Sequence, residues 1–200
     1  MDLGNLTLLS KIKEYQRRSD DIESYLNQYP KEWPLFQAEV SSSIDSMLLD
    51  ILYFEREGKG SQVARLRKLF ESRLRKYFLH GDITTWSLKK PYGYSGDFKI
   101  IDDIYINQPR TTGFDRLFDN HFLELPIAVA VRNRKQDFKD MILDFVKQHP
   151  HGEVKIMNLA CGPAREIKEL LEEDRQGIFA QVFFDCYDFN KDALVYAQKL

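Results

Sequence analysis

The sequence predicts an α/β protein, with a helical first part followed by the opening strands of a parallel sheet. From Leu6 to Phe78, apolar residues recur at the three- and four-residue steps of amphipathic helices. From Val154 to Asp188, an apolar strand, a turn of small residues, a helix and a second apolar strand follow one another. That order is typical of parallel strands joined by a crossover helix. With 200 residues, of which 43% are hydrophobic, the chain is long enough to bury a sizeable core.

Two kinds of break divide the first part into three expected helices. Pro30 and Pro34 interrupt the first run, and the glycines of the 58–60 segment interrupt the second. Because the apolar residues of each run fall on one helical face, the helices are expected to share one core. We therefore expect residues 1–85 to form an N-terminal helical domain.

The middle of the chain, residues 86–150, is expected to connect this domain to the sheet and to form a lid over a ligand. A looser stretch from Gly81 to Tyr94 leads to a helix that begins at Ser95. A short helix is expected over 113–125. Pro126 then suits the first position of a helix that runs to about Gln148.

The last part, residues 151–200, holds the clearest functional pattern. The first strand and its turn supply four candidate ligand-binding residues: Asn158, Ala160, Cys161 and Gly162. Small residues let the backbone come close to a ligand. Asp188, at the carboxyl end of the second strand, can accept hydrogen bonds from both hydroxyls of a ribose. The pattern predicts a site for an adenosine-like ligand.

These residues resemble the class I S-adenosylmethionine-dependent methyltransferases, whose Rossmann-like domain opens with an acidic residue in the first strand and a turn with three glycines. Here Asn158 stands at the acidic position, alanines replace two glycines, and Gly162 is kept. We therefore expect the turn to keep its small size but to lose some backbone freedom. Asp188, followed by Phe189, matches the family's acid after the second strand. The resemblance implies S-adenosyl-L-methionine as the cofactor, in contact with these residues.

Two other interpretations of this unit stay open. A dinucleotide-dependent oxidoreductase would use a glycine-rich turn at a helix start to bind a pyrophosphate. Pro163 is expected at the first helical position, where it removes one amide donor, and the turn lacks the second and third glycines of that motif. The methyltransferase is therefore favoured. The other interpretation is an ordinary strand, helix and strand with no ligand.

A second unusual segment, residues 90–98, reads KPYGYSGDF. It places two tyrosines, two glycines and a carboxylate at the start of a helix, which is typical of a ligand-facing loop. Tyr92 and Tyr94 are candidates to close over a positively charged sulfonium. Asp97 is the candidate base if the methyl acceptor is a hydroxyl or an amine. The structural alternative is a capped helix whose tyrosines fill a domain junction.

This segment, the run Ala130–Arg134 and the ligand-binding unit together resemble the bacterial extracellular-factor, or 3-hydroxypalmitic acid methyl ester, biosynthesis methyltransferases. The resemblance spans about Lys90 to Leu200 and leaves the leading helices unassigned. It implies O-methylation of a fatty-acid-type carboxylate, which yields a signalling methyl ester.

Helical phase singles out one arginine of this run as a candidate catalytic residue. Arg134 is expected to face inward and Arg132 outward, because only Arg134 falls on an apolar stripe of Ile127, Val131, Phe138 and Phe145. Arg134 is a candidate contact to the acceptor or to the cofactor carboxylate, and a structural ion pair is the alternative. Its replacement is expected to reduce turnover more than replacement of Arg132.

Composition narrows the class of partner. A net charge of -2 and an isoelectric point near 6.1 give no overall attraction to phosphate backbones, so a nucleic-acid partner is not expected. Cys161 and Cys186 suit the reduced thiols of a cytoplasmic protein. The 4 histidines form no close-spaced helical pair, so no metal site is expected. No secretory signal and no membrane span are visible.

The predicted sheet is too small to enclose a nucleoside, because two strands with one crossover leave its faces uncovered. We expect either that the chain continues past Leu200 or that another chain completes its open edge. Leu159, Val182 and Phe184 are expected to expose apolar surface unless something packs on them. In isolation, the chain is therefore expected to bind S-adenosylmethionine poorly and to self-associate. A non-catalytic helical interaction module is the alternative function.

Overall fold

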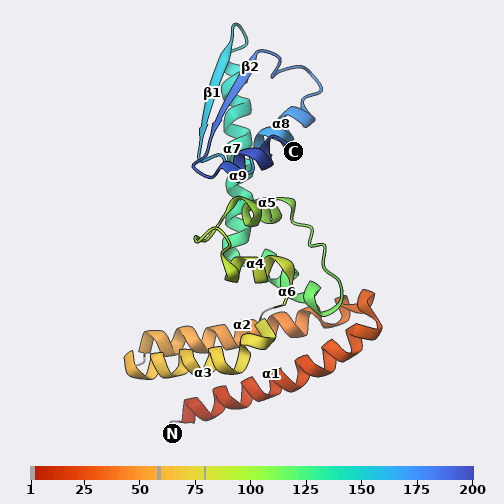
Figure 1. The fold of residues 1–200 in the computed structure, drawn as a ribbon, viewed down its shortest axis with the longest axis vertical. Helices are drawn as coiled ribbons and strands as arrows, with labels where there is room; N and C mark the ends of the chain where they lie inside the picture. The colour runs from red at the N-terminus through yellow and green to blue at the C-terminus, as the bar shows by residue number, and fades with distance from the viewer. Residues whose placement is uncertain (1–2, 58–59, 79) are drawn as a thin grey trace. The chain divides into compact units, whose positions relative to one another are not determined.

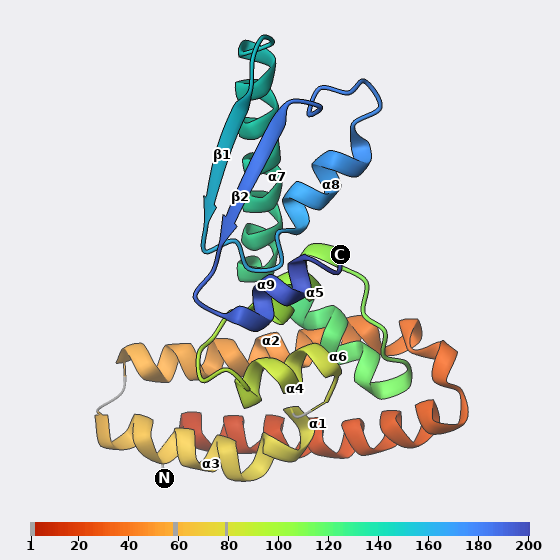
Figure 2. The ribbon, with the colours of Figure 1, turned by 45° about the horizontal axis from the view of Figure 1, so that its top comes forward.

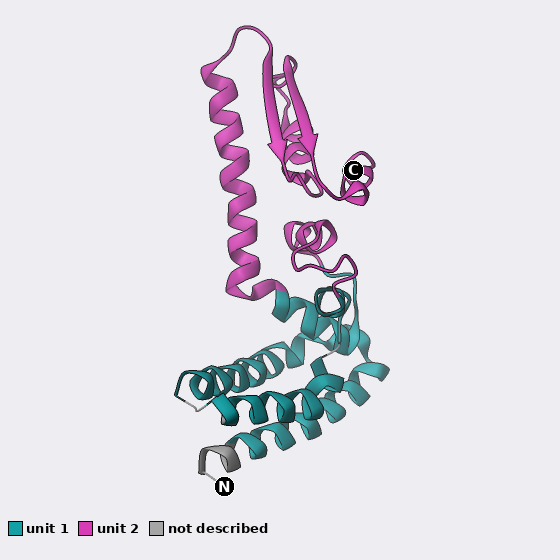
Figure 3. Cartoon of the chain, turned by 60° about the vertical axis from the view of Figure 1, so that its left-hand side comes forward, with its two compact units in different colours: residues 1–89, 109–122 teal, residues 90–108, 123–200 magenta. Residues whose placement is uncertain are grey.

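The computed structural model describes residues 3–57, 60–78 and 80–200. The expected helix break at Gly58 and Lys59 lies outside the described residues. The chain separates into two compact units, residues 1–89 with 109–122, and residues 90–108 with 123–200 (Figure 3). The division into domains 1–85, 86–150 and 151–200 stays a prediction.

The first unit is helical (Figure 1). Its elements are α1 (Leu3–Gln28), the 3-10 helix η1 (Pro30–Glu32), α2 (Pro34–Glu57), α3 (Gly60–Phe78), α4 (Asp82–Lys89) and most of α6 (Gly113–Glu124). The expected helical periodicity between Leu6 and Phe78 is confirmed by α1, α2 and α3. Their apolar faces meet in one core that includes Ile12, Ile44 and Leu74 and also Leu117 from α6.

One helix of this unit was not predicted. The expected loose stretch from Gly81 to Tyr94 contains α4, so that expectation was wrong over Asp82–Lys89. The first amides of α4 are bonded by Asp119, which lies in α6. A helix whose N-terminal acceptor lies far away in the sequence leaves no local capping signal.

The second unit contains the strands. Its elements are α5 (Phe98–Ile106), α7 (Pro126–Gln148), β1 (Val154–Leu159), α8 (Arg165–Glu173), β2 (Val182–Tyr187) and α9 (Lys191–Ala197). β1 and β2 pair in parallel, with Val154 opposite Val182 and Leu159 opposite Tyr187. This arrangement of helices around a small parallel sheet is compatible with the predicted α/β class.

Helices cover one face of this sheet (Figure 2). Ile142 and Val146 of α7 and Leu170 of α8 pack against Val154 and its neighbours. The opposite face carries Met157, Leu159, Phe183 and Tyr187, which are 51–68% exposed. Of the three residues expected to be exposed unless something packs on them, Leu159 is exposed, whereas Val182 and Phe184 are packed on the covered side.

Two helices in this unit begin later than the sequence suggested. α5 begins at Phe98 instead of Ser95, because the extended backbone of Asp97 makes that residue the N-cap. α8 begins at Arg165, so Pro163 is not its first residue. Ala164 precedes the helix in a left-handed conformation, with φ of 50°, which excludes it from the helix. Within the described ranges, no helix is long and apolar enough to cross a membrane.

Candidate functional site

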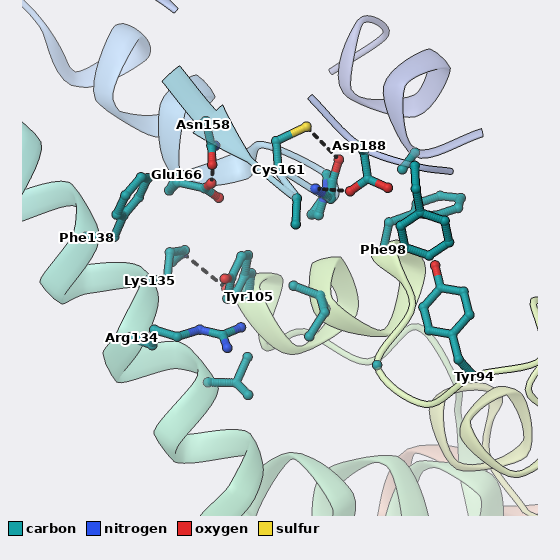
Figure 4. Close-up of a pocket in the computed structure, with 18 residues that line it drawn as sticks. Tyr94, Phe98, Tyr105, Arg134, Lys135, Phe138, Asn158, Cys161, Glu166 and Asp188 are labelled. Atoms are coloured by element: carbon teal, nitrogen blue, oxygen red, sulfur yellow. Dashed lines mark hydrogen bonds between the residues drawn. The ribbon is translucent and has the colours of Figure 1, made fainter. Parts of the chain in front are cut away.

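A cavity of about 500 Å³ lies within the second unit, at the carboxyl ends of β1 and β2 (Figure 4). Its remaining walls come from α5, α7, α8 and the start of α9. It brings together most of the predicted site residues: Tyr94, Arg134, Asn158, Ala160, Cys161, Gly162, Asp188 and Phe189. Tyr92 and Asp97 do not line it. The carboxyl ends of parallel strands are a common place for ligand sites, because the loops that follow the strands converge there.

The turn after β1 has a backbone shape that normally favours glycine. Ala160, Gly162 and Ala164 have φ values of 56°, 53° and 50°. The expected loss of backbone freedom has therefore not prevented the two alanines from adopting left-handed conformations, at a cost of about 1–2 kcal/mol each. A Cβ atom added to Gly162 would meet no atom within 4 Å, so the space in front of this residue is open.

Asp188 fastens this turn to the end of β2. Its Oδ2 atom accepts a hydrogen bond from the Gly162 amide at 2.9 Å, and its Oδ1 atom accepts one from the Asn190 amide at 2.8 Å. Each carboxylate oxygen has two lone-pair directions, so each keeps one for a ligand. The carboxylate thus holds the turn and can also accept hydrogen bonds from hydroxyls in the cavity.

The 90–98 segment contributes one tyrosine to the cavity. The Tyr94 ring lies 5.4 Å from the Phe189 ring, and its hydroxyl accepts a hydrogen bond from the Asn190 amide group at 3.3 Å. Tyr92 instead packs against Phe98, with ring centroids 5.2 Å apart. Of the two predicted tyrosines, only Tyr94 is therefore placed to contact a ligand in this cavity.

Asp97 is the N-cap of α5 and lies outside the cavity. Its Oδ1 atom accepts hydrogen bonds from the amides of Lys99 and Ile100 at 3.0 and 3.1 Å, and the residue is 2% exposed. A buried N-cap carboxylate of this kind fixes the start of α5. The geometry therefore favours the structural alternative for Asp97 and gives no support to a role as base.

Glu166 is a cavity residue that the sequence reasoning missed. It lies in the first turn of α8 and is only 7% exposed. Its Oε1 atom accepts a hydrogen bond from the Asn158 side chain at 3.2 Å, and its own backbone amide also donates to it. Burial raises the pKa of the Glu166 carboxyl above its usual value, because a charged form is poorly solvated there. The only sequence signal was an acid in a helix's first turn, which is common.

Arg134 lines the cavity, but the helical-phase argument behind its prediction was wrong. Ile127 and Phe145 of the supposed apolar stripe are 67% and 47% exposed, and α7 instead buries Ala128, Ile142 and Val146. Arg134 is itself exposed, because the cavity is open. Arg132 is half-buried and donates to the backbone carbonyl of Leu123 at 2.7 Å.

Tyr105, on α5, is a cavity residue that was also not predicted, and its hydroxyl lies near enough to Arg134 for the guanidinium to affect its pKa. Burial raises the pKa of Tyr105, and the neighbouring guanidinium opposes this rise without cancelling it. The phenol therefore stays protonated at neutral pH. A protonated phenol can donate its hydroxyl proton to an acceptor in the cavity.

A buried ion-pair network joins α7 to α8 beside the cavity. Lys135 and Lys139 contact the two oxygens of Glu169 at 2.6 and 3.1 Å, and Lys139 also contacts Glu173 at 2.8 Å. Burial alone would raise the pKa of Glu169, but the two ammonium groups outweigh it and lower that pKa. The network fixes the separation of the helices that carry Arg134 and Glu166.

A second polar cluster joins α5 to α8 and α9. Asp102 is 1% exposed and accepts two hydrogen bonds from Arg165, with the Nη2–Oδ2 pair at 2.8 Å. The Tyr196 hydroxyl donates to the same Oδ2 atom at 2.5 Å. Because Arg165 directly follows the turn after β1, this cluster positions the turn against the helix that forms the opposite wall.

The two cysteines are thiols with no disulfide. Cys161 is buried in the turn, and burial, with the neighbouring Cys186 as a smaller cause, raises its pKa to about 12. A thiol with such a pKa stays protonated at neutral pH and is a poor nucleophile. Cys161 therefore serves the turn as a small apolar residue and offers no covalent chemistry.

Together, the cavity at the ends of parallel strands, the small-residue turn and the Asp188 carboxylate define an α/β unit with a candidate ligand site. Residues 86–195 match the model of the family described as "Putative methyltransferase". Because this match covers more than half of the chain, the protein belongs to that methyltransferase family. Comparisons with curated proteins and with solved structures found no match.

Proposed function

We propose that this protein transfers a methyl group from S-adenosyl-L-methionine to a small-molecule carboxylate of the fatty-acid type. The observation that carries the proposal is the Asp188 carboxylate, held at the end of β2 by the Gly162 amide. Two acceptor oxygens beside an open small-residue turn suit the adjacent hydroxyls of a ribose. Family membership favours methyl transfer over a dinucleotide-dependent oxidation or a non-catalytic module.

The residues present fit this cofactor. The open space at Gly162 leaves room for a ligand against the backbone, and a cavity of about 500 Å³ lies within the usual range for small-molecule sites. The Tyr94 ring, beside Phe189, suits a positively charged group because the face of an aromatic ring carries negative potential. When bound, S-adenosylmethionine supplies a methyl group activated by the positive charge on sulfur.

A carboxylate acceptor places modest demands on the protein. It is already ionised and nucleophilic at neutral pH, so no general base is needed. The chain must exclude water and orient the acceptor. Phe98, Ile101, Val131 and Phe138 give the cavity an apolar wall suited to an acyl chain, and the protonated Tyr105 hydroxyl is a donor suited to an acceptor oxygen.

The cofactor assignment predicts that Asp188→Ala weakens binding of S-adenosylhomocysteine by about 1.5–3 kcal/mol, the range for a hydrogen bond to a charged group. Isothermal titration calorimetry measures this affinity. Asp174→Ala is the matched control, because Asp174 also bonds backbone amides, at Ile178 and Phe179, but lies outside the cavity. Equal affinity in wild type and Asp188→Ala, with both folded, would exclude the ribose role.

The acceptor class is tested with methyl-labelled S-adenosylmethionine and a series of fatty acids. A methyl ester releases its label as methanol in mild alkali, whereas a methyl ether or a methylamine keeps it. Alkali-labile product supports the carboxylate acceptor. Product that keeps its label in alkali would contradict it and leave the methyltransferase assignment intact.

A further inference from the structure

Two side chains of opposite charge line the same cavity without an ion-pair partner of their own. Glu166 has no Lys, Arg or His nitrogen within 4.0 Å among the described residues, and Arg134 has no carboxylate oxygen within that distance in the same part of the chain. The other charged pairs nearby are satisfied, including Lys135 with Glu169 and Arg165 with Asp102. Besides the Asp188 carboxylate, which is bonded to backbone amides, the cavity therefore presents one carboxylate and one guanidinium that have no ion-pair partner.

The surroundings of Glu166 make its charge costly in the absence of a ligand. The side chain is more than nine-tenths buried, and its hydrogen-bond donors, the Asn158 amide group and its own backbone amide, are neutral. A buried carboxylate with neutral partners is poorly compensated, so a cation that enters the cavity gains a strong interaction. The Arg134 charge acts on Glu166 only as a weak long-range contribution.

We propose that Glu166 and Arg134 bind the amino-acid group of S-adenosylmethionine, with the Glu166 carboxylate on the ammonium group and the Arg134 guanidinium on the carboxylate. This inference rests on the proposed function and specifies which end of the cavity takes which part of the cofactor. Asp188 then takes the ribose. A zwitterion fits because it supplies both missing charges at once, and an arginine fork matches a carboxylate in geometry.

Two alternative roles for Glu166 make different predictions. If Glu166 and Arg134 form a structural pair, removing either charge should destabilise the unliganded protein. If Glu166 is a base for the acceptor, its removal should affect turnover and leave cofactor affinity unchanged. A buried carboxylate that serves ligand binding instead lowers the stability of the folded protein when no ligand is present. Glu166→Gln should therefore raise the melting temperature of the unliganded protein and weaken its binding of the cofactor.

The experiment uses ligands that lack parts of the amino-acid group. S-adenosylhomocysteine has both charges of the amino-acid group and methylthioadenosine has neither. Glu166→Gln should therefore weaken the binding of S-adenosylhomocysteine about tenfold or more and that of methylthioadenosine less than about twofold. Decarboxylated S-adenosylmethionine keeps the ammonium but not the carboxylate. Arg134→Gln should therefore weaken the binding of S-adenosylmethionine about tenfold and leave the binding of the decarboxylated compound nearly unchanged. Glu166→Gln should weaken the binding of both compounds.

Glu172→Gln and Arg132→Gln are the matched controls, because they remove the same charges from the same helices outside the cavity. They should leave the ratios of dissociation constants between these ligands unchanged. Calorimetry measures the ratios, and thermal unfolding without ligand measures stability. A wild-type protein that binds neither S-adenosylhomocysteine nor methylthioadenosine would overturn the proposed function itself. If the wild-type protein binds both ligands, two results would overturn only the amino-acid site. One is that Glu166→Gln weakens the binding of the two ligands equally, and the other is that it lowers the melting temperature.

Discussion

Glu166 and Glu169 lie one turn apart on α8 and have opposite electrostatic surroundings. Burial with neutral partners raises the pKa of Glu166, and the ammonium groups of Lys135 and Lys139 overcome burial to lower the pKa of Glu169. A carboxyl whose pKa is raised by folding contributes stability that is fully present below its pKa in the unfolded chain. This stability is lost as pH rises through its pKa in the folded protein. A carboxyl whose pKa is lowered by folding contributes stability that is present above its pKa in the unfolded chain and is lost as pH falls through its pKa in the folded protein.

These two directions predict opposite effects of the same substitution. At pH 7 we expect Glu166→Gln to raise the free energy of unfolding and Glu169→Gln to lower it, each by about 1 kcal/mol or more. The Glu166 difference should vanish near about pH 3, where that carboxyl is protonated in both states, and the Glu169 difference should shrink as pH falls through the lowered folded pKa of Glu169. Urea unfolding across this pH range measures them. Changes of the same sign at pH 7 would contradict the assigned surroundings.

Residue by residue, the sequence was informative where the chemistry is local. The position of Asp188 and of the small-residue turn at the cavity could be predicted because each directly follows a strand. Glu166 could not, since its contact with Asn158 and its burial depend on how α8 packs. The direction of Arg134 was inferred from Ile127 and Phe145, but apolar side chains on a long helix can stay exposed, as these two do.

Among the elements, α4 depends on a distant residue for its N-terminus. Both carboxylate oxygens of Asp119 accept backbone amides, with Ile83 at 2.9 Å and Asp82 at 3.1 Å, and Oδ2 also accepts the Thr111 hydroxyl at 2.8 Å. Gly81 is required beside it, because a Cβ atom there would lie 2.3 Å from Oδ1. The long helices were predictable from their periodicity, whereas this capping contact joins residues more than thirty positions apart.

We expect Asp119→Ala to lower the free energy of unfolding by about 2–4 kcal/mol, because it leaves several buried donors without an acceptor. Asp119→Asn keeps one acceptor oxygen and should cost roughly half as much. Denaturant unfolding, followed by far-ultraviolet circular dichroism, measures both. Equal stability of wild type and Asp119→Ala would show that α4 does not need this cap.

For the molecule as a whole, the uncovered sheet face is the main apolar surface of the second unit. Met157, Leu159, Phe183 and Tyr187 are each more than half exposed and lie together on two paired strands. The same face also carries the exposed Lys155 and Asp185, opposite Phe183 and Met157. Exposed apolar side chains gathered on one face favour association. The sequence predicted such a surface but assigned some of its residues to the wrong face, because one residue of register decides which side of a strand is covered.

We expect the protein to self-associate as its concentration rises and Leu159→Lys to reduce this association, because a charge on that face is costly to bury. Leu171→Lys is the matched control, since Leu171 is also exposed but lies on α8. Sedimentation velocity over a concentration series measures both. A wild-type protein that stays monomeric throughout would show that this face does not drive association.

The two halves of helix α7 contact different parts of the second unit. Its first half supplies Val131, Arg134 and Phe138 to the cavity, and its second half supplies Ile142 and Val146 to the sheet core. At 1.5 Å per residue, Arg134 and Ile142 are separated by about 12 Å along the helix axis. Selection can therefore alter the first half, and with it the preferred acceptor, while the second half keeps the fold. Relatives with different substrates are expected to diverge most at Val131 and Phe138 and to keep Arg134, which is proposed to bind the shared cofactor.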